Sequence, residues 1–445
     1  MVTSIHCVGH FGYVLRDDGF AEAGVKRFAT RASILLAFLA VPAAAQSAKQ
    51  SQSGGEVRRQ IAAALERGDR TAVTANALLL ARMEGSLSDA TFTRIAPFLD
   101  AAQITAARIP WIRNSTESPI EALHSFFRYL ADPRQRGELG EPVAMVPAEY
   151  RLVEGIAWDA KTRRLFIGTV IDGRLAYRDE AGQWHEVPLG FPRASLFGMA
   201  VDPTRRLLWI TTGSVEQTAV AGERMTGLIA VNLDSLQVVR RVPLAPEAKG
   251  VAGDLVIASD GTVYVTNVTS GAVHRCAPGC TTLEDWLPAG SWKNPQGMAL
   301  FDKDRRLYLA DYMTGLWVID TRTRRFRQVE TRDPTMLDGI DGLVAGPEGM
   351  MAIQNGTSPR RIVKLYRARD GWLGPISWRH IFASTRAIAG REAGDPTLGA
   401  SDGGEMYFVM DGQWERYGPG GSIIDGKPPR PTPIGRMDLY DVFIT

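Results

Sequence analysis

Cysteine, histidine and net charge are all scarce in this chain, and each shortage excludes a class of function. Three cysteines and six histidines among 445 residues leave no Cys/His group at the spacing of a zinc site. A formal net charge of +2 provides no electrostatic footprint for nucleic acid. No glycine-rich phosphate loop precedes a predicted helix. A zinc hydrolase, a nucleic-acid binder and a P-loop enzyme are therefore not expected.

Long apolar runs are also absent, and the one short run near the N-terminus has a specific setting. Ser33 to Val41 is too short to span a bilayer, follows three basic residues and precedes Ala43–Ala45. This order of positive, apolar and small residues is typical of a secretory signal. We therefore expect residues 1–45 to be a leader and signal peptide, with a mature chain that has no membrane span and is periplasmic or secreted.

Cys276 and Cys280 are the cysteines that remain after this cleavage. Two thiolates without further ligands make a poor zinc site. The Ala-Pro-Gly between them is typical of a turn. We predict a disulfide across a hairpin end, formed in an oxidising compartment and adding modest stability because its loop is short.

Glycine and proline are abundant, with 45 and 25 residues, which favours short strands and turns over long helices. The exception runs from Glu56 to about Leu130, where apolar residues recur with a helical period and Ser88 is placed to cap a helix. We predict that residues 46–142 form a linker and a small helical domain. This domain either packs against the main domain or serves as a lid or a contact for a protein partner.

Six related phrases follow from Val143 onward, each a short strand, a polar turn and a second apolar strand. Their opening glycines recur at intervals of 43 to 57 residues, and segments that read as two further strands follow each pair. Four strands per unit at this period indicate a β-propeller. The predicted fold class is all-β, a six-bladed β-propeller over residues 143–445 preceded by the helical segment. The opening glycines are Gly155, Gly198, Gly253, Gly297, Gly342 and Gly399.

Three of these glycines follow a residue with a side-chain oxygen: Glu154, Gln296 and Asp341, in the first, fourth and fifth repeats. The innermost strand of each blade lines the central channel of a propeller. Residues at the same offset on different blades should therefore converge at the mouth of the channel. The sequence predicts a polar cluster there.

The phrases around these residues resemble the family of gluconolactonases, senescence-marker proteins and luciferin-regenerating enzymes, with paraoxonases as distant relatives. The resemblance spans about Tyr150 to Thr445 and is carried by LVEGIAWD, GDLVIASDGTVYVTN, PQGMALFDKDRRLYLAD and IDGLVAGPEGMMAIQN. It implies a divalent metal, calcium above all, held at the channel mouth by Glu154, Gln296 and Asp341. It also implies that Asp254 contacts substrate and that Asp341 is catalytic and activates water.

Two positions depart from the family pattern. Gln296 stands where the family has an asparagine ligand, and Gly253 stands where the family has an asparagine that touches substrate. Two bidentate carboxylates and one amide would supply about five of the 6–8 oxygens that calcium takes, and water would supply the rest. The departures weaken the expected site without removing it.

Two functions therefore remain open. Glu154 and Asp341 favour an exported, metal-dependent hydrolase of the lactonase or carboxylic-ester type, with a small-molecule lactone or ester as substrate. Gly253 and Gln296 favour a non-catalytic periplasmic propeller that binds a ligand or a protein partner over its top face. Metal content and a panel of lactones and esters would separate the two.

Overall fold

The structure is a computed structural model that describes residues 53–132, 142–190, 194–220, 225–329, 331, 334–347, 349–358, 360–366, 394–424, 426 and 428–439, and the backbone of strands at 137–138, 377–380 and 383–384. The predicted signal peptide, residues 1–45, lies outside the described residues.

Six short α-helices and a 3-10 turn form the first part of the described chain, as the sequence predicted. Ser88 caps α3 through a hydrogen bond from the Thr91 N–H, and Ser118 and Glu121 form a capping box at α6. The helices enclose a hydrophobic core of their own, which includes Val57 and Phe127. No helix among the described residues is both long and apolar enough to cross a membrane. The bounds are α1(Gly54–Glu66), α2(Arg70–Arg82), α3(Asp89–Ile95), η1(Ala96–Phe98), α4(Ala101–Ala106), α5(Pro110–Arg113) and α6(Pro119–Ala131).

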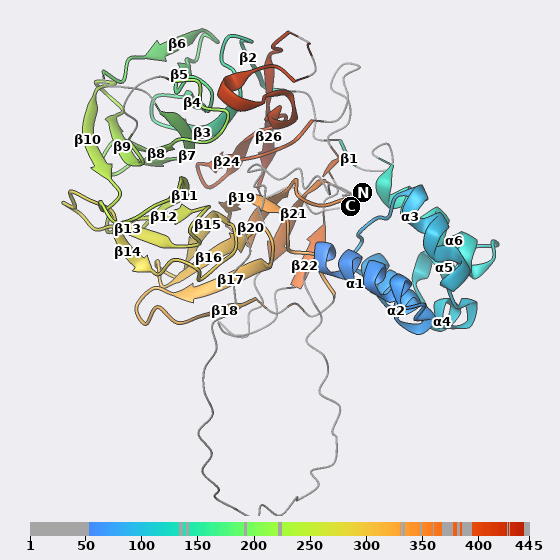
Figure 1. Cartoon of the computed structure of the whole chain (residues 1–445). Coiled ribbons are helices and arrows are strands. Elements are labelled where there is room, and N and C mark those ends of the chain that lie inside the picture. The colour runs from blue at the N-terminus through green and yellow to red at the C-terminus, as the bar shows by residue number, and fades with distance from the viewer. Residues whose placement is uncertain are drawn as a thin grey trace, which may run out of the picture. The chain divides into compact units, whose positions relative to one another are not determined.

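Six four-stranded antiparallel sheets follow and form a ring in the described part of the chain (Figure 1). The predicted six-bladed β-propeller is confirmed. A parallel pair, β1(Gly137–Glu138) and β23(Ala383–Ser384), lies outside the blades. Blades one to three are β3(Val153–Asp159), β4(Arg164–Thr169), β5(Leu175–Arg178), β6(Trp184–Val187); β7(Ser195–Asp202), β8(Leu207–Gly213), β9(Gly227–Asn232), β10(Val238–Pro243); and β11(Ala252–Ile257), β12(Val263–Asn267), β13(Val273–Cys276), β14(Glu284–Leu287). Blades four to six are β15(Pro295–Phe301), β16(Arg306–Asp311), β17(Gly315–Asp320), β18(Phe326–Gln328); β19(Ile340–Ala345), β20(Gly349–Gln354), β21(Arg361–Tyr366), β22(Ser377–His380); and β24(Gly399–Ser401), β25(Glu405–Val409), β26(Thr432–Asp438), β2(Ala144–Val146).

The core of the propeller lies between the blades. Six hydrophobic clusters each combine residues of two neighbouring blades, and together they run around the whole ring. Phe166 of blade one and Leu208 of blade two, for example, are fully buried in the same cluster. Because each sheet is covered on both faces, its strands carry nearly continuous apolar runs rather than alternating ones.

The ring closes in blade six, where β2 from before the first blade pairs with β26 near the C-terminus. The sequence predicts that the segment before Glu154 closes the ring with the C-terminal stretch Asp438 to Thr445. The segment before Glu154 does close it, but β2 pairs with Thr432–Ile434 instead, and residues 440–445 lie outside the described residues. The closing strand is β26(Thr432–Asp438), which pairs with β25 on its other side. Pro433 lies inside this strand, where a proline is unusual, so its sequence resembles a loop more than a strand.

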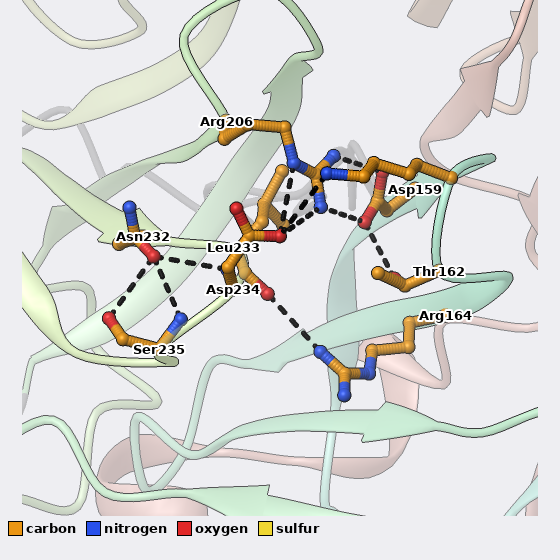
Figure 2. Close-up of polar contacts among 9 residues, drawn as sticks. Asp159, Thr162, Arg164, Arg206, Asn232, Leu233, Asp234 and Ser235 are labelled. Atoms are coloured by element: carbon orange, nitrogen blue, oxygen red, sulfur yellow. Dashed lines mark hydrogen bonds and ion pairs between the residues drawn. The ribbon is translucent and has the colours of Figure 1, made fainter.

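An arginine joins blades one and two outside their apolar core (Figure 2). Arg206 donates to both carboxylate oxygens of Asp159 at 2.7 and 2.8 Å and to the exposed Asp234 at 3.0 Å. Burial raises the pKa of Asp159, but hydrogen bonds from Arg206 and Thr162 outweigh this effect and hold it below its ordinary value. The pair ties the end of β3 to the turn between β7 and β8.

Cys276, at the end of β13, is joined to Cys280 by a disulfide, with their Cα atoms 5.4 Å apart. The bridge closes the turn between β13 and β14 in blade three.

Candidate functional site

The inner strands of five blades share one irregularity near their beginning. In β3, β7, β11, β15 and β19 the register against the second strand shifts by one residue. Such a bulge adds an unpaired residue and re-aims a side chain, and bulges are frequent beside active sites. Glu154, Gln296 and Asp341 each lie in one of these bulges.

The glycine after each of these residues is required by the neighbouring blade. A Cβ on Gly155 would collide with the carbonyl oxygen of Phe197, one on Gly297 would lie 2.5 Å from the backbone nitrogen of Leu343, and one on Gly342 would lie 2.7 Å from the carbonyl oxygen of Thr397. The ring packs the bulge of one blade against the backbone of the next. The bulge residue before the glycine is therefore the one that can carry a side chain.

Blade three inverts this order. Its bulge consists of Gly253 and Asp254, between the paired residues Ala252 and Leu255. Gly253 thus occupies the place of Glu154, and Asp254 occupies the place of the glycine. The alignment of Gly253 with the other opening glycines is therefore wrong by one residue.

Glu154 is 5% exposed and accepts a hydrogen bond from the indole Nε1 of Trp414 at 2.8 Å. Trp414 begins a 3-10 turn, η4(Trp414–Arg416), in the long connection between β25 and β26. The sequence comparison of the six repeats did not find Trp414, because it lies between the strands that repeat. The indole fixes the orientation of the carboxylate.

Asp341 is 1% exposed and accepts a hydrogen bond from Asn355 Nδ2 at 2.7 Å. Asn355 Oδ1 in turn accepts from the Tyr312 hydroxyl at 2.9 Å. Burial and, to a smaller extent, the charge of Asp341 raise the pKa of Tyr312 well above its ordinary value, so this hydroxyl stays a donor. The sequence held a signal for Asn355, since the second strand of each repeat ends near a small or polar residue.

Gln296 is 7% exposed, and its Nε2 donates to Asn294 Oδ1 at 2.7 Å. This bond uses the amide nitrogen of Gln296 and leaves its carbonyl oxygen as the atom suited to a ligand. Each of the three predicted ligands is thus nearly buried and oriented by a neighbour.

Asp254 lies at the channel itself. It helps line a cavity of about 180 Å³ between the inner strands of all six blades, together with Trp158, Met199, Leu343 and Ser401 among others. Burial, and to a smaller extent the charge of Asp341, raises the pKa of Asp254 to about 7, although the backbone N–H groups of Leu255 and Met298 hydrogen-bond its carboxylate and oppose the rise. The charge of Asp341 thus acts on the carboxylate of Asp254.

The chemistry of the three predicted ligands suits a hard cation. Two carboxylates and an amide carbonyl are oxygen donors of the kind that calcium and magnesium take. Hydrogen bonds from Trp414 and Asn355 orient the carboxylates, as partners of metal ligands commonly do. Within the described ranges no three His, Cys, Asp or Glu side chains come together as a metal group, so a site here depends on the Gln296 amide and on water.

Comparison with known proteins identifies no family for this chain. No protein-family model matches this chain, and no curated protein matches its sequence. Similar solved structures include a gluconolactonase from Xanthomonas campestris, 14% identical, with 62% of this chain and 97% of that chain covered and a TM-score of 0.39. They also include the calcium-binding protein regucalcin from Agrobacterium tumefaciens, with 14% identity, 61% and 87% coverage and a TM-score of 0.43. A virginiamycin B lyase from Staphylococcus aureus has 12% identity, 58% and 77% coverage and a TM-score of 0.42.

A gluconolactonase and a regucalcin are thus among the structures similar to this chain, in line with the resemblance found in the sequence. At these identities and TM-scores the similarities carry no argument about what the chain binds or catalyses.

Proposed function

We propose that this chain hydrolyses a small lactone or carboxylic ester at the end of the channel where the bulges lie. The observation that carries the proposal is the shared position of Glu154, Gln296 and Asp341, one per bulge, each nearly buried. Burying carboxylates costs free energy, so their burial at one end of the channel supports a role in binding or catalysis.

Glu154, Gln296 and Asp341 are the residues that would hold a divalent cation, and their oxygens favour calcium. Such a cation, when bound, polarises an ester carbonyl. Asp341 would accept a proton from the attacking water, and Asn355 donates a hydrogen bond to its carboxylate. Asp254 lines the channel cavity and would hydrogen-bond a substrate oxygen there.

The test is a panel of lactones and carboxylic esters assayed with and without added calcium, magnesium, manganese and zinc. We expect metal-dependent turnover by the wild type and a loss on the order of 10²-fold or more in kcat/KM for Asp341→Asn. Glu284→Gln is the control, since Glu284 is an exposed acid paired with Arg275 in blade three. No turnover of any substrate under any metal would refute the hydrolase.

A second function, a non-catalytic propeller that binds a ligand, is favoured by one observation. Gly253 leaves blade three without a side chain at the position that carries Glu154, Gln296 and Asp341 elsewhere. Binding of panel compounds without turnover, measured by calorimetry, would support this function.

Export remains part of the proposal and rests on the order of basic, apolar and small residues before Gln46. Mass spectrometry of the protein from its native host should find an N-terminus at or near Gln46. A full-length cytoplasmic product would contradict export.

A further inference from the structure

The segment from Met336 to Asp341 belongs to two hydrophobic cores and to the candidate site at once. Met336 is fully buried in the core of the helices, whereas Leu337 and Ile340 are buried in the core between blades four and five. Asp341 follows directly in β19. A displacement of this short segment would therefore act on the helices and on the site together.

The N-terminus of α1 is fixed by a carboxylate of this segment. The Asp338 side chain accepts hydrogen bonds from Ser53 Oγ at 2.9 Å, from the Gly54 N–H at 2.8 Å and from the Gly55 N–H at 3.0 Å. A negative charge at a helix N-terminus is favourable, because it meets unpaired N–H groups and the positive end of the helix dipole. A Cβ at Gly54 would collide with the Met336 sulfur, so glycine permits this approach.

The other side of the same segment is bonded to the end of β20. Gln354 Nε2 donates to the carbonyl oxygens of Met336 and Asp338 at 2.9 and 2.8 Å. The fully buried Arg361 donates to Gln354 Oε1 at 2.6 Å and to the Met336 carbonyl at 3.1 Å. The residue after Gln354 is Asn355, which donates to the carboxylate of Asp341.

We propose that the helical segment 53–131 is a positioning part of the site, with Asp338 as its positioning residue. Asp338 joins the α1 N-terminus to the backbone that leads into Asp341, and Gln354 carries the same restraint to Asn355. The helices thereby hold the Asp341–Asn355 pair in the geometry that a cation and a substrate need. The expected effects on calcium affinity and on kcat rest on the proposed function, whereas the expected effect on hydrogen exchange does not.

The experiment compares the full chain with Asp338→Asn, which keeps the shape of the side chain but removes its charge and one acceptor oxygen. Ser358→Ala is the matched control. It removes another contact between helices and propeller, Ser86 Oγ to Ser358 Oγ at 2.6 Å, and leaves the Asp338 bonds in place. Hydrogen exchange of residues 340–355, the calcium-dependent shift in Tm, and kcat and KM on the best panel substrate are measured for all three proteins.

Asp338→Asn should speed exchange over 340–355 and leave blades one to three unchanged. It should also weaken calcium affinity on the order of tenfold, the lower end for residues that support metal ligands, and lower kcat more than it raises KM. Ser358→Ala should change neither. Faster exchange confined to the helices, with 340–355 and calcium affinity unchanged, would overturn the inference. If the wild type shows neither calcium binding nor turnover, the proposed function fails, and the exchange measurement alone then decides the positioning role.

Discussion

The indole N–H of Trp414 donates to the carboxylate of Glu154 at 2.8 Å, across 260 positions of sequence. Glu154 is the second residue of the inner strand of blade one, and Trp414 lies in the connection between β25 and β26 of blade six. Ring closure places the two blades side by side, so a residue outside every repeat comes to orient a residue inside one.

Replacing Trp414 with phenylalanine should destabilise the protein by about 1–3 kcal/mol, because the buried Glu154 carboxylate loses a donor. Trp292→Phe is the matched control. Trp292 is also buried, but its indole nitrogen has no hydrogen-bond partner among the residues described, so only packing is lost there. Urea denaturation should show the larger loss for Trp414→Phe. Equal losses would mean that the indole bond contributes nothing.

Asp254→Asn should stabilise the metal-free protein above pH 7. With a folded pKa of about 7 against an ordinary value of 3.8, the native state keeps a proton that the unfolded chain releases. The free energy of unfolding of the wild type should therefore fall as pH rises from about 4 to 7 and stay level above this range. Asparagine resembles the protonated acid and should remove this fall. Tm measured from pH 4 to 8 in chelator checks it, and parallel curves for the two proteins would contradict the shift.

Much of the fold was predictable from the sequence because the blade repeats itself. Each repeated phrase contains an opening glycine, a short strand, a polar turn and a second apolar strand. Six such phrases in the sequence correspond to six blades. The bulge residues Glu154, Gln296 and Asp341 could be aligned for the same reason. The inversion at Gly253 and Asp254 could not, since a one-residue exchange leaves the glycine count of the phrase intact and appears only in the strand register.

The orienting partners were harder to predict because they come from outside the aligned positions. Trp414 lies in the connection between β25 and β26, outside the strands that were aligned, and Asp338 acts through a helix that is distant in sequence. Contacts of this kind depend on ring closure and on domain packing, which local periodicity does not encode.

Asp159→Asn should lower stability by about 1–3 kcal/mol near pH 7, since Asp159 is buried and accepts two hydrogen bonds from Arg206 (Figure 2). The pKa of Asp159 lies below its ordinary value of 3.8, so its contribution is present above this pH and is lost as pH falls through the folded pKa. The wild type and the variant should therefore converge below about pH 4.

Asp234→Asn serves as the control for that experiment. Asp234 binds the same arginine, but its side chain is 54% exposed, so its loss should cost less than about 1 kcal/mol. A variant at Asp159 no less stable than the one at Asp234 would contradict the role of the buried pair.

Two truncations distinguish the observed ring closure from the one that the sequence suggested. Ending the chain at Gly435 removes half of β26, which pairs with β2 on one side and β25 on the other. The β2 ladder at Thr432–Ile434 stays, but the β25 ladder loses its pairs at Arg436, Met437 and Asp438. The backbone of Glu405–Tyr407 in blade six is left unpaired, and Tm should fall sharply. Ending the chain at Leu439 keeps β26 whole, together with the bonds from the Leu439 N–H to the Gly404 carbonyl and from Lys364 Nζ to the Leu439 carbonyl. This longer chain should unfold close to the full-length protein in a thermal scan. A large loss of stability in it would show that residues 440–445 take part in closure after all.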